Sequence, residues 1–91
     1  MLLRVNPAVR LHWRHWDCDW IVFDETSGNT HAMGELAACA LLCLDEGAMH
    51  AEALIAEVAT ATSLPPETIR AGLQDEVAQL VRLALVDIVP A

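Results

Sequence analysis

Four residues in the first third of the chain are of types that ligate metals, namely His12, His15, Cys18 and His31. Imidazole and thiolate are ligands that zinc prefers. His12, His15 and Cys18 are spaced by three residues, but strand residues three apart point to opposite faces, so His12 and His15 cannot converge on one ion. The sequence contains no CxxC or HExxH motif. We therefore predict no metal and no other cofactor, and the role of these four residues stays open.

The residues that could act as nucleophiles are Ser27, Cys39 and Cys43. Ser27 lacks the GxSxG elbow of a hydrolase. Cys39 and Cys43 lie four residues apart on one face of a predicted apolar helix, where burial raises the thiol pKa and makes the sulfur unreactive. The neighbouring acids Asp45 and Glu46 indicate a solvated helix end rather than an acid–base couple. Because no nucleophile, base and orienting group come together, we predict that the chain is not an enzyme.

The charge of the chain limits the classes of partner that it can bind. Thirteen acidic residues face five arginines, lysine is absent, and the formal net charge is −8. Nucleic-acid and anionic membrane surfaces attract basic patches, which this composition lacks. No apolar run reaches the ~18 residues of a membrane span, and the first residues lack the pattern of a secretory signal. We predict no nucleic-acid partner, no membrane partner and a cytoplasmic location.

Strand-like runs fill the first part of the chain after an expected flexible arm over residues 1–10. The runs rich in Trp, Val, Ile, Phe and Thr are Leu11–Trp16, Trp20–Asp24 and Asn29–Met33. The short gaps between them carry turn residues, which predicts antiparallel hairpins. Residues 11–91 are of a length that suits one domain.

After Gly34 the apolar period becomes helical, and three helices follow. The first ends at Asp45-Glu46-Gly47, and the second runs from about His50 to Thr60. The third begins after Pro65-Pro66, because proline fits the first turn of a helix. Its predicted apolar face comprises Ile69, Leu73, Val77, Leu80 and Val81.

The third helix should end near Leu83-Ala84, before a closing short strand over Leu85–Val89. The predicted order is a three-stranded antiparallel sheet, three helices and a C-terminal strand. This is an α+β fold with the pattern of a winged helix-turn-helix.

Three tryptophans lie within eight positions, at Trp13, Trp16 and Trp20. Trp13 and Trp16 fall on opposite faces of a regular strand, so one of them should be exposed or lie in an interface. An unpaired strand edge could also hold two copies together. A homodimer therefore stays open.

These features resemble the PqqD-like family of small peptide chaperones, also called recognition elements for ribosomally made, modified peptides. The resemblance covers about residues 13–89, and Ser27-Gly28-Asn29-Thr30-His31 is most similar to the branch associated with HPr-kinase-related proteins. The family usually has glycine at the position of Ala84, and alanine at a positive φ is strained, so the turn there could differ. The matching residues are the Trp16 and Trp20 pair, Trp20–Asp24, Ser27–His31, Leu44–Gly47 and the Leu80, Ala84, Leu85, Val86 pattern.

The resemblance implies a non-catalytic chaperone that captures a leader peptide and presents the precursor to a modifying enzyme or an HPr-kinase-related protein. In similar proteins the leader adds a strand to the edge of the N-terminal sheet, in a groove beside the third helix. Carried onto this sequence, the peptide-binding residues would be Asn29, Thr30, His31, Ala32 and Met33 on the strand, with Ile69, Arg70, Leu73 and Val77 on the helix.

Two other functions remain open at this point. One is an acidic winged-helix regulator, whose recognition helix would be Pro66 to Arg82. That helix carries Arg70 and Arg82 against three acids, which disfavours contact with DNA phosphates. The other is a structural dimerisation module that takes no ligand.

Overall fold

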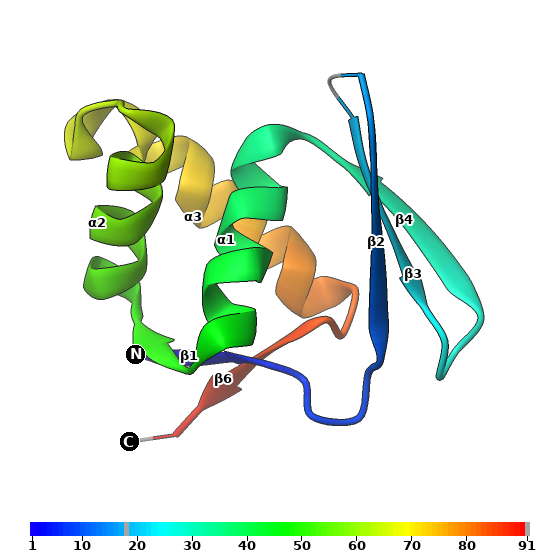
Figure 1. Cartoon of the computed structure of the whole chain (residues 1–91). Helices are drawn as coiled ribbons and strands as arrows, with labels where there is room; N and C mark the ends of the chain where they lie inside the picture. The colour runs from blue at the N-terminus through cyan, green and yellow to red at the C-terminus, as the bar shows by residue number, and fades with distance from the viewer. Residues whose placement is uncertain (18, 91) are drawn as a thin grey trace.

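The protein consists of a helical half and a three-stranded sheet that stands beside it (Figure 1). The computed structural model describes residues 1–17 and 19–90, with Trp16 described by its backbone only. The predicted α+β fold is confirmed. The elements are β1 (Leu2–Val5), β2 (Leu11–Trp16), β3 (Asp19–Asp24), β4 (Asn29–Met33), α1 (Glu35–Glu46), β5 (Met49–His50), α2 (Ala51–Thr62), α3 (Pro66–Arg82) and β6 (Val86–Val89).

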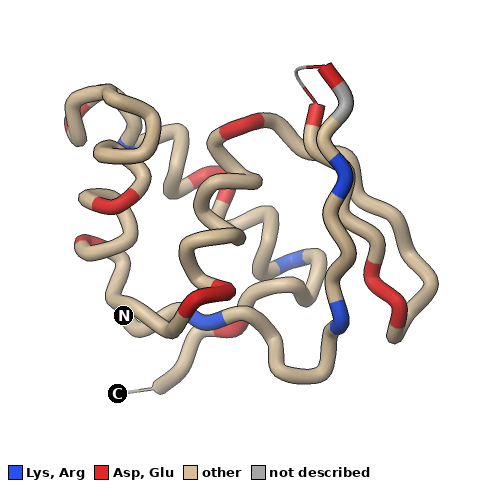
Figure 2. The backbone as a smooth tube through the Cα atoms, in the orientation of Figure 1, with Lys and Arg blue, Asp and Glu red and all other residues tan. Residues whose placement is uncertain are grey.

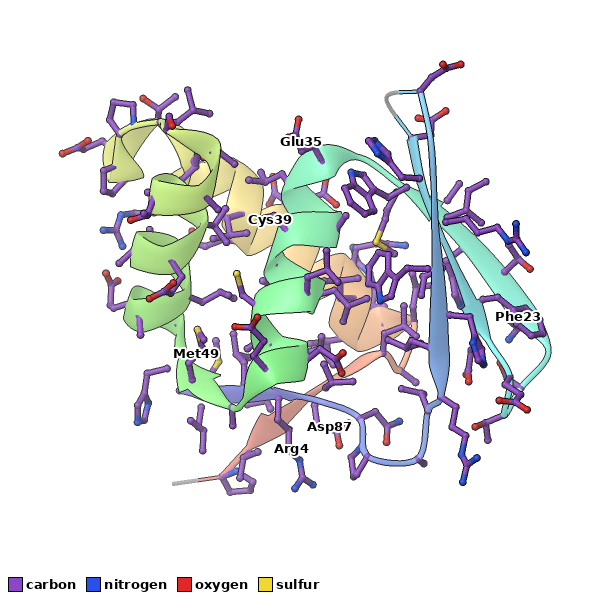
Figure 3. The ribbon with its side chains drawn as sticks, in the orientation of Figure 1. Arg4, Phe23, Glu35, Cys39, Met49 and Asp87 are labelled. Atoms are coloured by element: carbon purple, nitrogen blue, oxygen red, sulfur yellow. The ribbon has the colours of Figure 1, made fainter. Side chains whose placement is uncertain are left out.

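The predicted N-terminal sheet is present, and its strands lie in the order β2-β3-β4, antiparallel throughout. Alternation along β3 directs Trp20, Val22 and Asp24 toward the helices, and Ile21 and Phe23 away from them. Val22 is fully buried in the core, whereas Phe23 is exposed on the outer face (Figure 3). One face of the sheet therefore completes the core and the other faces solvent.

The first residues are not the flexible arm that we expected. Leu2–Val5 form β1, which pairs with β5 on one side and with β6 on the other, so the start and end of the chain lie side by side (Figure 1). Leu3 is buried, and the Asn6 side chain donates a hydrogen bond to the Ala84 carbonyl oxygen at 2.9 Å. The strand forms because its apolar side chains meet a partner strand more than eighty residues away, which no local pattern reveals.

The three helices lie close to their predicted positions and bury an apolar core between them. α1 contributes Ala37, Ala38 and Ala40, whose small side chains let neighbouring helices approach closely. Gly72 of α3 marks such an approach, since a Cβ there would lie 3.3 Å from Cδ2 of Leu36. Other fully buried large side chains are Leu3, Leu41, Leu54, Leu73, Leu80 and Leu85.

The ends of α2 and α3 share one geometry, in which a residue with positive φ reverses the chain. At the end of α3, Ala84 has φ 61°. The Leu85 amide donates to the Leu80 carbonyl and the Ala84 amide to the Val81 carbonyl, both at 3.0 Å, as in a Schellman motif. Ala84 thus adopts a positive φ that glycine takes more easily, and the strain is tolerated rather than avoided.

No helix among the described residues is long and apolar enough to cross a membrane.

Candidate functional site

β4 is an edge strand whose outward backbone groups can be assigned from the hydrogen-bond register. The Glu25 amide donates to the Arg10 carbonyl at 2.8 Å, which makes the facing Leu11–Asp24 pair a non-hydrogen-bonded one. Asp24 therefore directs its N–H and C=O toward Asn29 of β4. Along β4, every second residue from Asn29 onward forms hydrogen bonds with β3. Thr30 and Ala32 consequently direct their N–H and C=O groups away from β3.

The β4 edge is accessible over its whole length. Asn29, Thr30 and Ala32 are exposed, whereas His31 and Met33 are half-buried. Met33 packs against the core, and α1 begins two residues beyond it. Within the described part of the chain, β4 pairs with β3 alone. Two residues of the strand, Thr30 and Ala32, thus have an unpaired N–H and C=O, and the half-buried side chains of His31 and Met33 alternate with them.

Asp24 holds the turn from which β4 starts. Its carboxylate accepts hydrogen bonds from the Ser27 hydroxyl at 2.9 Å and the Thr26 amide at 3.0 Å. It also accepts one from the Arg10 amide at 3.3 Å, which ties the start of β2 to the same turn. Burial alone would raise the pKa of Asp24, but these hydrogen bonds to the ionised form outweigh it and hold the pKa below its ordinary value. The site therefore rests on a charged and nearly buried anchor.

Trp13 of β2 and Trp20 of β3 pack on the inner face of the sheet. The Trp13 and Trp20 rings meet edge to face with centroids 5.9 Å apart, and His15 stacks on Trp20 at 4.2 Å. The Trp13 indole N–H is buried without a hydrogen-bond partner among the described residues. We predicted that Trp16 lies on the opposite face of the strand from Trp13, but the Trp16 side chain is outside the part that the structure describes.

The candidate metal ligands that the structure describes do not all lie on the same face of the sheet. His12 lies on the outer face, where its Nε2 is 3.0 Å from Glu25 Oε2, while His15 lies on the inner face. His31 pairs with Val22 and so shares the inner face. Cys18 lies outside the described residues. No group of three His, Cys, Asp or Glu side chains within residues 1–17 and 19–90 is placed to hold a metal ion.

The helix residues proposed from the sequence occupy other places than a groove beside β4. Ile69, Leu73 and Val77 are only 4%, 1% and 8% exposed, because they pack in the core. Arg70 lies on the flank of α3 that faces α2, where its Nη1 is 2.6 Å from Glu52 Oε1. The apolar stripe of α3 was correctly located, but it is occupied by the protein itself. These four residues are therefore not free to line a groove at β4.

A second hollow, which the sequence did not predict, lies on that same α2 flank of α3. We call it the α2–α3 groove, a cavity of about 440 Å³ with walls from β1, α2, α3 and β6. Its apolar lining includes residues that are far apart in sequence, so no local signal could have found it. Representative lining residues are Leu3, Leu54, Leu73, Val77, Arg82 and Ile88.

Cys39 and Cys43 are half-buried neighbours on α1 (Figure 3 labels Cys39). Burial raises the pKa of both thiols, and the adjacent Cys39 and the acidic Glu57 and Glu46 help to raise that of Cys43 to about 11. The prediction that burial raises their thiol pKa is confirmed. A thiol with such a pKa is almost wholly protonated near neutral pH and is a poor nucleophile.

Figure 2 marks the positions of the arginines and acids along the backbone. The arginines differ in the side chains that their guanidinium groups contact. Arg4 pairs with Asp87 at 3.6 Å, from β1 to β6, and Arg70 pairs with Glu52. The Glu52 contact raises the pKa of Arg70, and Arg70 in turn lowers that of Glu52. Arg82 instead donates from Nε and Nη2 to the neutral side-chain oxygen of Gln79, at 3.2 and 2.9 Å. Its positive charge is thus not matched by a carboxylate in that contact.

Neither a protein-family model nor a curated protein matches this chain. A solved structure does, namely TbiB1 in complex with the TbiA(beta) leader peptide. The two share 17% sequence identity and superpose with a TM-score of 0.68, over 97% of this chain and 99% of that one. This likeness shows the fold and supports the PqqD-like architecture that the sequence resemblance implies.

Proposed function

We propose that this protein binds the leader segment of a precursor peptide by strand addition at β4. The observation that carries the proposal is the free edge of β4, where Thr30 and Ala32 have N–H and C=O groups that β3 does not use. Strand addition obtains affinity from such backbone groups and register from alternate side-chain contacts. It needs no positive charge on the receptor, which suits a chain of net charge −8. The leader peptide bound to the solved TbiB1 structure supports the same class of ligand.

The α3 side of the peptide groove is proposed to be the flank that faces α1 and not the buried stripe. Gly72 lies against Leu36 at the start of α1, the helix that follows β4. Glu76 and Gln79 continue this flank at helical spacing and are not fully buried. They replace Ile69, Arg70, Leu73 and Val77 in the proposal, while the strand residues Asn29–Met33 are kept.

The bound leader would leave the rest of the precursor free for a second protein. We propose a modifying enzyme or an HPr-kinase-related protein in that role, with the present chain acting as a non-catalytic presenter. The raised thiol pKa of Cys39 and Cys43 supports the absence of nucleophilic chemistry at the most obvious candidates.

The test uses synthetic leader peptides encoded by the short genes that neighbour this one, titrated into the ¹⁵N-labelled full chain. We expect amide shifts at Thr30 and Ala32. Ala32→Pro removes one outward N–H that the sheet does not use, so the fold should persist. Affinity should fall about tenfold, the equivalent of one backbone hydrogen bond.

Ala32→Val is the matched control, because it changes the same side chain and keeps the amide. It should bind as the wild type does. The proposal fails if no such peptide shifts Thr30 or Ala32 at about 1 mM, the weak end of specific recognition. It fails equally if Pro and Val at position 32 weaken a bound peptide alike.

A further inference from the structure

The α2–α3 groove has the dimensions and lining of a small-molecule site and lies apart from the β4 edge. Its volume of about 440 Å³ falls within the ~300–1,000 Å³ of typical ligand pockets. Leu3, Leu54 and Leu73 are fully buried side chains at its base, and Ile88, 49% exposed, stands at its margin. The groove is therefore a formed apolar hollow that opens to solvent.

One charged side chain lines this groove among the described residues, and it is the cation Arg82. In a chain with thirteen acids, this apolar hollow thus has a positively charged side chain in its lining. The guanidinium is held by the neutral Gln79 oxygen, which orients it without neutralising it. Arginine binds carboxylates through paired N–H donors, more strongly than it binds a neutral amide.

We propose that the α2–α3 groove binds an amphipathic carboxylate, with its apolar chain among the leucine and valine side chains and its carboxylate at Arg82. The apolar chain gains by leaving water, and the carboxylate gains by exchanging with or bridging the Gln79 contact. Because the groove lies on the α2 flank of α3, a ligand there would leave Thr30 and Ala32 free. The site is thus a further binding function, distinct from the β4 edge, although Gln79, the partner of Arg82, also belongs to the flank proposed for the peptide.

The test titrates decanoate into the full-length protein labelled at its Leu, Val and Ile methyl groups. We expect shifts at Leu54, Leu73, Val77 and Ile88, with saturation below the micelle-forming concentration of decanoate. Decyltrimethylammonium, with the same chain and the opposite charge, should bind at least about tenfold more weakly, since it meets Arg82 with like charge.

Two pairs of variants sharpen the test. Arg82→Gln should weaken decanoate about tenfold, whereas Arg70→Gln, which removes the same charge from the same helix, should leave it unchanged. Ala78→Phe places a ring in the groove and should abolish binding, while Ala71→Phe, two helical turns earlier and outside the groove lining, should not. Circular dichroism of each variant confirms that the helices are kept.

Three outcomes would overturn the proposal. The first is no methyl shift with decanoate at concentrations just below its micelle-forming limit. The second is equal affinity for the carboxylate and the ammonium probe, or equal weakening by Arg82→Gln and Arg70→Gln. The third is a dimer in sedimentation velocity that Ala78→Phe dissociates, because the groove would then be filled by a second copy of the chain.

Discussion

The two flanks of α3 offer two kinds of recognition. The flank toward α1 meets Leu36 at the start of α1, the helix that follows β4, and the free groups of β4 are backbone N–H and C=O at Thr30 and Ala32. The flank toward α2 lines a hollow whose surface is made of leucine, valine and isoleucine side chains, with Arg82 at its margin. Unpaired backbone groups bind an extended peptide through its own backbone, which depends little on the peptide sequence. An apolar hollow instead selects its ligand by size and charge. One helix thus separates the surface that we propose for a peptide from the groove that we propose for a small amphiphile.

The largest expected effect tests whether the middle of α3 is core or contact surface. Leu73 is 1% exposed, so Leu73→Ala should lower the free energy of unfolding by about 2–5 kcal/mol. Urea denaturation followed by circular dichroism measures this. Thr30→Ala, on the exposed β4, is the control and should stay within about 0.5 kcal/mol of wild type. A loss below about 1 kcal/mol for Leu73→Ala would show that Leu73 is not a core residue and would return it to the proposed peptide contacts beside β4.

The second effect tests the anchor of the β4 flank through its pH dependence. Because the folded pKa of Asp24 lies below its ordinary value near 3.8, its ionised form stabilises the protein above that pH. This contribution is lost as the pH falls through the lowered folded pKa. The melting temperature of the wild type should therefore decline on acidification, with the decline continuing below pH 3.8.

Asp24→Asn is the matched variant, since asparagine keeps the size and does not titrate. It should be less stable than wild type at pH 7, because the hydrogen bonds from Ser27 and Thr26 lose their charged acceptor. The difference between the two proteins should shrink toward pH 2. Parallel melting curves over the whole pH range would show that Asp24 is not the anchor of this turn.

The smallest effect concerns the turn that connects the groove helix to β6. Ala84 holds φ 61°, a conformation that costs a residue with a Cβ about 1–2 kcal/mol. Ala84→Gly should therefore stabilise the protein by about 0.5–1 kcal/mol, after the greater freedom of glycine in the unfolded chain is counted. Thermal melting measures it. Ala71→Gly, inside α3, should destabilise by about 1 kcal/mol, and the same sign for both would exclude strain at Ala84.

Local pattern was sufficient for most of the elements. The alternation in Asn29–Met33 and the helical stripe through Ile69 and Val77 matched β4 and α3. The strand β1 was missed because its partners, Met49–His50 and Val86–Val89, are distant in sequence. The same distance hid the α2–α3 groove, whose walls come from four elements.

The candidate site was half predictable for a related reason. Exposure alternates along a strand with period two, so exposed positions such as Thr30 can be recognised from sequence alone, whereas the edge position of this strand was implied by the family resemblance. Along α3, however, the sequence shows that Leu73 is apolar and does not show what covers it. Only packing decides what covers an apolar side chain, and here Leu73 and Val77 pack in the core and line the α2–α3 groove instead of facing β4.

The amino-acid sequence by itself therefore determined the acidic character of the chain and the order of β2 to β4, the three helices and β6. These properties follow from composition and from periods of two and 3.6 residues, which act over short distances. The tertiary structure decided that residues 2–5 form a strand, that Arg70 pairs with Glu52, and that Arg82 stands at the rim of an apolar groove. Each of these depends on which distant segments meet, because burial and charge pairing are properties of the packed chain and not of its local order.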